Sequence, residues 1–502
     1  MVATWTRRNW HFLVAVLALS AVVVPMIPLG LGSWDAWGVI RSTNALVEQG
    51  IFSVSRPPGH PTVEFVFLPA LARALRAFGL PFGPESYLVQ LWLVSATSLV
   101  LFMKLMERVG VSPRDSLLAA ACLVLAPAFL AQSANGEETT WALALLLGAW
   151  LVLLPSRQGK DDPPSHARVA IAGALLALAV GARPEVGVMG LPFAWFVLRR
   201  ASRPIPDVVL YCGAFAVVSC LLWIPVVAAG SPLTPIPLTT DWRTRLVGAG
   251  YKHLFLILPF PASIVLWAGF FVALYRWRRC PDSPGRSFVA IIWVVPVMFA
   301  LMFFVYPTKP AFCVPGIAFL LLVLAVARAR TWLTLGLVFL VLALAIRVDL
   351  FRDRVFVGPT LMQGEIPWLV RSKPRGQLGT LARAIILTDE PKTVVLVRLV
   401  TSELDWLIAQ HHTSLRRVSF ASGGRTHILY KNSPTGASFL VPGDASGDFD
   451  WWRELAHQGY SFLLDGDMYR SFFSPYSVHE QPKAGDRVSV PFDGGKLDCI
   501  LF

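Results

Sequence analysis

The chain is built from long apolar runs that are separated by short basic connections. Runs of about 20 apolar residues are long enough to cross a bilayer as helices, and the sequence contains eleven of them. Only 15% of the 502 residues are charged, whereas soluble domains carry about 25%. We therefore expect a polytopic α-helical membrane protein. The approximate centres of the runs are Val22, Thr97, Leu123, Leu146, Leu175, Pro192, Ser219, Trp267, Val297, Leu321 and Leu340.

Arginine and lysine clusters, such as those at residues 104–114, 199–203 and 276–286, fall on every second connection between these runs. Because basic loops stay in the cytoplasm, the alternation predicts a plasma (inner) membrane protein with a cytoplasmic N-terminus. The clusters also explain much of the net charge of +13, so no nucleic-acid partner is expected. The first run, residues 11–32, lacks a small-residue cleavage motif and is predicted to remain as a transmembrane helix.

The C-terminal region has a different pattern. Residues 393–400 have the composition of a buried strand and residues 402–412 that of a helix, and further strand-like and helix-like segments alternate after them. This alternation predicts an α/β domain at residues 351–502, on the outer side of the membrane. Residues 1–350 form the predicted transmembrane domain, with 33–86 as its first outside loop.

The densest polar chemistry lies in that first loop. Asp35 begins an amphipathic segment, residues 36–50, and a turn with the sequence RPPGHP follows, which contains Arg56 and His60. Either Ser33 or Asp35 is the N-cap of a helix from residue 36 to about residue 49, or Asp35 is a general base or cation ligand. Arg56 either extends to lipid headgroups or binds a phosphate through its planar guanidinium. His60 is either a turn residue or an assisting group, and Glu64 is a partner for one of these.

More ionisable groups lie on the same predicted side. Glu137 and Glu138 precede the fourth run, where acids favour a helix N-terminus or complete an acid or metal site. Arg183 and Glu185 interrupt an apolar stretch, either as a structural ion pair or as functional groups near membrane depth. Acids and cations from several loops therefore meet at one face, as a site for a charged headgroup on a lipid tail requires. Tyr306 and Lys309 follow the ninth run on that side.

These motifs resemble the GT-C class of membrane glycosyltransferases, in particular the dolichyl-phosphate-mannose–protein mannosyltransferase and aminoarabinose-transferase-like superfamily. The similarity extends to a C-terminal α/β domain on the outer side. An Asp-Glu pair of many members is Asp35-Ala36 here, which argues against protein O-mannosylation. The similar elements are Asp35, the segment 36–50, the RPPGHP turn at 56–61, Glu138, Arg183-Pro184 and the segment 306–319.

The resemblance implies transfer of a sugar from a polyprenyl-phosphate donor to a glycan, lipid or protein acceptor at the outer face, among membrane lipids. Asp35 would be the catalytic base, Glu137 or Glu138 would support it, and Arg56 and Lys309 would contact the lipid phosphate. A divalent cation, Mg²⁺ or Mn²⁺, is the expected cofactor, with Asp35 and Glu138 as its ligands. The further substrate contacts would be His60, Arg183 and Tyr306.

Two other functions stay open. A transporter or lipid flippase is the first, although such proteins carry inverted repeats and broken helices, and the sequence shows no such halves. A non-catalytic assembly subunit is the second, and in it the outward acids would serve only as helix caps.

Overall fold

A computed structural model of the chain separates by its contacts into two units, Met1–Arg371 and Ser372–Phe502, and each is described by itself. The described residues are 2–29, 34–52, 54–55, 59–135, 138–154, 163–230, 242–279, 286–305, 310–349, 354–357, 381–382, 384–388, 390, 392–397, 399, 401, 404–405, 407–408, 414–422, 425–432, 438–442, 455–464, 485, 487–492 and 495–501.

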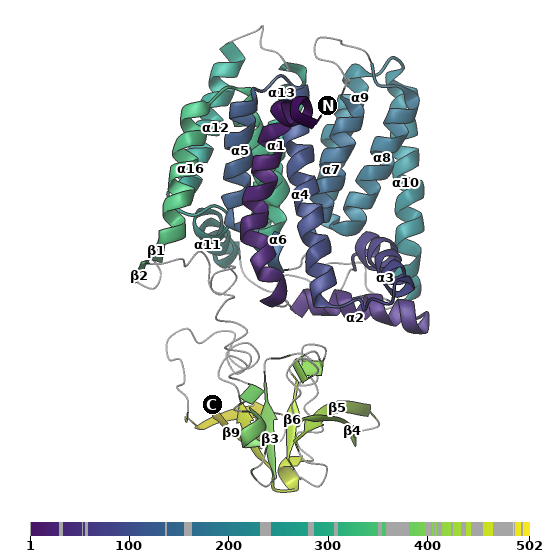
Figure 1. Ribbon diagram of the computed structural model, residues 1–502, viewed down its shortest axis with the longest axis vertical. Helices are drawn as coiled ribbons and strands as arrows, with labels where there is room; N and C mark the ends of the chain where they lie inside the picture. Colours follow the sequence, from purple (N-terminus) through teal and green to yellow (C-terminus); the bar gives the residue numbers. More distant parts are fainter. Residues whose placement is uncertain are drawn as a thin grey trace. The chain divides into compact units, whose positions relative to one another are not determined.

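The first unit is a bundle of helices, with α2 lying across one end of it and α3 beside α2 (Figure 1). A two-stranded antiparallel hairpin, β1 (Ile346–Asp349) with β2 (Arg354–Val357), also belongs to this unit. The helices are α1 (Val2–Val23), α2 (Trp34–Gln49), α3 (Leu68–Ala77), α4 (Pro84–Arg108), α5 (Pro113–Leu125), α6 (Pro127–Asn135), α7 (Thr139–Leu153), α8 (His166–Ala182), α9 (Gly190–Arg200), α10 (Pro204–Ala228), α11 (Trp242–Lys252), α12 (Ala262–Arg279), α13 (Arg286–Ile292), α14 (Val294–Val305), α15 (Val314–Val326) and α16 (Arg330–Ala345). Short 3-10 or π-helical segments are η1 (Val24–Leu29), η2 (Thr62–Phe67), η3 (Pro184–Met189), η4 (His253–Ile257) and η5 (Pro310–Cys313).

Every predicted run centre lies in one of these helices. Among the described residues, α4 and α10 are long and apolar enough to cross a membrane, and α5 with α6 adds a third if the bent pair counts as one span. The 66° bend of that pair follows from Pro127, because the residue before a proline avoids the helical conformation. Seven further apolar helices have 10–17 residues, so the number of eleven spans stays a prediction.

Helix α2 confirms the predicted amphipathic helix and corrects where it begins. It ends at Gln49, and the φ of +71° at Gly50 suits glycine after a helix. The helix starts at Trp34, so Asp35 lies inside its first turn and is not the N-cap, while the other N-cap candidate, Ser33, lies outside the described residues. The buried apolar side chains at the start of α2 are Ala36, Trp37, Val39 and Ile40.

Close glycine contacts hold η2 and α10 against α8. A Cβ at Gly173 would lie 2.4 Å from the carbonyl oxygen of Tyr211 in α10, and one at Gly181 would lie 2.3 Å from Oγ1 of Thr62 in η2. The Thr62 hydroxyl donates to the carbonyl oxygen of Leu178 at 2.8 Å. Small residues therefore let η2 approach the C-terminal end of α8, where the polar groups described below gather.

The second unit contains a mixed seven-stranded sheet in the order β4-β5-β6-β3-β7-β9-β8, which confirms the predicted sheet-containing C-terminal region. Its central strands β6, β3, β7 and β9 are parallel, and the outer strands are antiparallel. All four residues of β3 are buried, as expected for a parallel strand covered on both faces. The strands are β3 (Thr393–Leu396), β4 (Arg416–Ser422), β5 (Arg425–Lys431), β6 (Phe439–Val441), β7 (Ser461–Leu464), β8 (Arg487–Phe492) and β9 (Gly495–Leu501).

Candidate functional site

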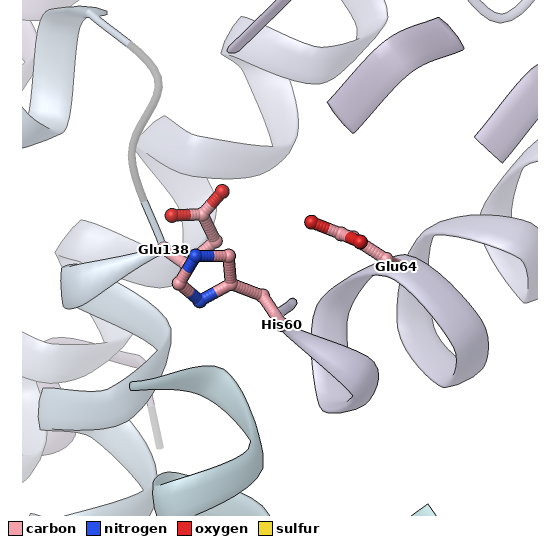
Figure 2. A group of neighbouring side chains, drawn as sticks. All are labelled: His60, Glu64 and Glu138. Atoms are coloured by element: carbon pink, nitrogen blue, oxygen red, sulfur yellow. The ribbon is translucent and has the colours of Figure 1, made fainter. Parts of the chain in front are cut away.

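Three buried ionisable side chains converge where η2 packs against α8. One ligand atom from each of His60, Glu64 and Glu138 lies within 4.8 Å of the other two, and the residues are 3%, 0% and 0% exposed. Figure 2 shows the His60 ring beside the Glu138 carboxylate, with the Glu64 carboxylate directed toward both from η2. Since buried charges are costly unless they are paired, this cluster needs nearby positive charge.

His60 is set into the cluster by a glycine turn. Gly59 has a φ of +95°, and a Cβ there would lie 2.6 Å from Cγ1 of Val54, so glycine is required for both conformation and space. His60 Nδ1 lies 2.7 Å from the carbonyl oxygen of Ala182, the last residue of α8. A proton on Nδ1 donates to that oxygen, which places the lone pair of the ring on Nε2.

Glu64 lies in the π-helix η2 and holds the preceding loop. The backbone N–H of Ser55 donates to Oε2 of Glu64 at 3.2 Å, and the Ser55 hydroxyl donates to the other carboxylate oxygen. Because Ser55 directly precedes Arg56 in the sequence, this double contact fixes the chain just before that residue. The sequence suggested Arg56 or His60 as the partner of Glu64, and the structure adds Ser55.

Arg183 supplies positive charge to the cluster from the break between α8 and η3. Pro184 prevents the helix from continuing, and Arg183 is extended, with φ −149° and ψ 106°. The Arg183 side chain is 3% exposed, and its Nη2 lies 3.3 Å from Oε2 of Glu138. Its Nε lies 3.9 Å from Oε1 of Glu185, and the guanidinium lies 5.7 Å from the ring centre of Phe312. The predicted Arg183–Glu185 pair therefore exists, but Glu138 is the nearer partner.

The structure thus brings together three of the predicted site residues, Glu138, His60 and Arg183. Glu138 occupies the N-cap position of α7 without a side-chain capping hydrogen bond. It therefore lies both at the start of the helix and in the cluster. The other predicted residues lie outside the described side chains, and their roles stay predictions. They are Asp35, Glu137, Arg56, Tyr306 and Lys309.

The sequence assigned Glu64 only as a partner of Arg56 or His60, and the structure places it in the buried cluster itself. The residue stands alone as a charge in the apolar stretch TVEFVF, and an ionisable group in such a stretch is a functional candidate. Ser55 carried no signal at all, because a serine next to a proline turn is common and its contact with Glu64 is set by the fold.

Among the described residues, the cluster contains more acids than fixed cations. Glu64 and Glu138 lie beside the ring of His60, and Glu138 and Glu185 lie beside the guanidinium of Arg183. An imidazole next to carboxylates can accept or hold a proton, and the carboxylates can also attract a cation.

No family model and no curated protein matches the chain. Two solved structures are similar to it over almost their whole length, and both are crystal structures of ArnT from Cupriavidus metallidurans. One is bound to undecaprenyl phosphate, and its alignment covers 95% of this chain and 96% of the ArnT chain, with a TM-score of 0.52 and 14% sequence identity. The other, in the apo state, covers 95% and 97% with the same TM-score and identity. At this identity the likeness establishes the fold, which confirms the expected GT-C-like architecture.

Proposed function

From the fold shared with the two ArnT structures, we propose that this protein is an integral membrane glycosyltransferase with a polyprenyl-phosphate-linked sugar as donor. One of those ArnT structures holds undecaprenyl phosphate, a lipid of the class that such a reaction releases. The observation that carries the proposal is the buried Arg183–Glu138 pair beside His60 and Glu64. Burying so many ionisable groups costs stability, so a site explains them better than a scaffold does.

The proposed reaction is a displacement at the anomeric carbon of the donor sugar. A hydroxyl or amine of the acceptor attacks this carbon, and the Asp35 carboxylate takes the proton from the attacking group. The bond between the anomeric carbon and the phosphate oxygen breaks, and its electron pair leaves with the polyprenyl phosphate. Arg56 and Lys309 offset the charge that develops on the phosphate. Tyr306 contributes a further contact to the substrate.

The residues of the buried cluster are proposed to position the groups that carry out this displacement. Arg183 stabilises Glu138 in its ionised form by direct pairing. Glu64 fixes the loop that leads into Arg56 through Ser55. His60 joins that loop to the end of α8. Glu137, next to Glu138 in the sequence, is proposed to add negative charge near the acceptor.

A divalent cation is proposed as cofactor, and the described residues fit it. His60, Glu64 and Glu138 offer one ring nitrogen and two carboxylate oxygens within 4.8 Å of one another. Two bonds of about 2.1 Å span at most about 4.2 Å, so these side chains would move closer together around an ion. A metal-binding histidine usually donates its other N–H to a fixed acceptor, as His60 does to Ala182. The mixed set suits Mn²⁺ better than Mg²⁺. Such an ion supplies positive charge to the site, with Asp35 as a further proposed ligand.

The reaction is proposed to take place at the outer face of a plasma (inner) membrane. The alternating basic clusters support this orientation, with the N-terminus in the cytoplasm and the C-terminal unit outside. The acceptor is a glycan, lipid or protein at that face.

The test is transfer of label from a radiolabelled polyprenyl-phosphate sugar in membranes that contain the full-length protein. Asp35→Asn, Arg56→Ala and Glu138→Gln are compared with Arg76→Gln, which removes an exposed arginine paired with Glu48. We expect each of the first three to lower the rate by a factor of about 10²–10⁴ and the control to keep it.

Full transfer by Asp35→Asn and Arg56→Ala would contradict the site. Solute uptake into vesicles without any transfer of label would replace the proposed activity with that of a transporter. Cation dependence is measured separately, by titrating Mn²⁺ into the chelator-treated protein and into its Glu64→Gln variant.

A further inference from the structure

The first unit contains a groove that lies far from the buried cluster. It is an apolar groove of about 710 Å³ formed by α1, α5 and α16, and α5 packs against both of the other helices (Figure 1). Arg108, at the end of α4, donates to the carbonyl oxygen of Leu154, just after α7. Glu138 lies at the opposite end of α7, which has 15 residues and is therefore about 22 Å long. The groove and the cluster thus belong to opposite ends of the bundle.

The end of the groove near Arg108 is positively charged. Arg114 lies in the first turn of α5, and Arg330 is the first residue of α16. Nε of Arg330 lies 2.7 Å from Oδ1 of Asp115, which joins the two helix starts and neutralises one charge. Arg114 is exposed at this end, and among the described residues that line the groove there is no acid. The groove entrance therefore favours an anion.

The length of the groove corresponds to one leaflet of a bilayer. It is lined along α5 from Arg114 to Leu125, a rise of about 16 Å. Half of a typical hydrocarbon core is about 15 Å. Trp10 also lines the groove near its charged end and is 44% exposed, as tryptophans at the membrane–water interface are. A partner transmembrane helix would need the full thickness, whereas a phospholipid needs one leaflet.

We propose that this groove binds a glycerophospholipid with an anionic headgroup. Its phosphate contacts Arg114 and Arg330, and one acyl chain lies along the aliphatic wall past Ala18 toward Leu125. Basic pockets between transmembrane helices bind anionic headgroups in this way. The bound lipid links α1 to α5 and α16 at the basic end of the bundle, and the inference does not depend on the transferase activity.

The test is lipid titration of the purified, delipidated full-length protein in detergent, with bound lipids counted by native mass spectrometry. Phosphatidylglycerol is compared with phosphatidylcholine of the same acyl chains. We expect phosphatidylglycerol to bind more tightly than phosphatidylcholine. Arg114→Gln should weaken the binding of phosphatidylglycerol about fivefold, which is the contribution of one arginine near the membrane surface. Arg76→Gln, which removes one charge elsewhere, should leave binding unchanged.

A second variant tests the acyl-chain wall. Ala18 is exposed to the groove, so Ala18→Phe fills space without disturbing the core, and thermal unfolding verifies that the variant is folded. We expect it to abolish binding of phosphatidylglycerol. Equal binding of the two lipids, equal weakening by Arg76→Gln, or unchanged binding to Ala18→Phe would overturn the proposal. Displacement of phosphatidylglycerol by equimolar undecaprenyl phosphate would assign the groove to the polyprenyl-phosphate lipid of the proposed reaction instead and overturn the proposal too.

Discussion

Arg183→Gln is the substitution that most directly probes the buried pair. Arg183 and Glu138 are 3% and 0% exposed, and their nearest charged atoms lie 3.3 Å apart. Removing one partner of a buried ion pair leaves an uncompensated charge and typically costs about 3–5 kcal/mol. We expect Arg183→Gln to lower the free energy of unfolding by this amount, because Glu138 and Glu185 both lose the guanidinium with which they pair.

The double variant Arg183→Met/Glu138→Gln separates charge from shape. With both charges removed, the penalty of an unpaired ion disappears, and such replacements are often neutral or stabilising. We expect the double variant to regain most of the stability that Arg183→Gln loses, so that the two sites couple by about 3 kcal/mol. Transfer activity should stay low in both variants, since stability returns without the chemistry.

The measurement is denaturant unfolding of the full-length protein in detergent micelles, followed by tryptophan fluorescence, in parallel with transfer of labelled sugar. Arg76→Gln is the control, because its pair with Glu48 is exposed and such pairs contribute about 0.2–1 kcal/mol. If Arg183→Gln costs no more than this control, Glu138 is uncharged or compensated from elsewhere, and the reasoning is refuted.

Two further changes test how the cluster is positioned. Gly181→Ala forces a Cβ against Oγ1 of Thr62 and should lower the free energy of unfolding by about 1–3 kcal/mol. The control is Gly213→Ala on α10, where an added Cβ meets nothing within 4 Å. Equal effects of the two variants would contradict the close contact. Ser55→Ala removes the hydroxyl that donates to Glu64. We expect it to weaken Mn²⁺ binding about 10–100-fold in a calorimetric titration. An unchanged affinity for Mn²⁺ would remove Glu64 from the proposed ligands.

Local patterns in the sequence predicted the elements well. The run centres lie in helices because apolar length is a local property. The helix before Gly50 was predictable from its amphipathic spacing and from the glycine that ends it. The start of α2 was missed by two residues, as helix ends commonly are: an acid near a helix start suits both the cap and the first turn.

The cluster itself was only partly predictable. Glu138, His60 and Arg183 each stood out as ionisable residues beside apolar runs, but no periodicity says which of them meet. The contact of Arg183 with Glu138 depends on how α7 and α8 pack, and the contact of Ser55 with Glu64 depends on the path of a loop. The sequence favoured Glu185 for Arg183 because it is only two positions away, and nearness in the chain is a weak guide to nearness in a bundle.

The hydrogen bond between His60 and Ala182 also has a consequence for biosynthesis. The two residues are 122 positions apart, and at about 5–20 residues per second roughly 6–24 s separate their synthesis. Glu138 is made within that interval, before Arg183, the arginine with which it pairs. Its carboxylate must therefore stay hydrated or protonated until α8 has been completed. A nascent chain stalled before Arg183 would hold Glu138 without that arginine.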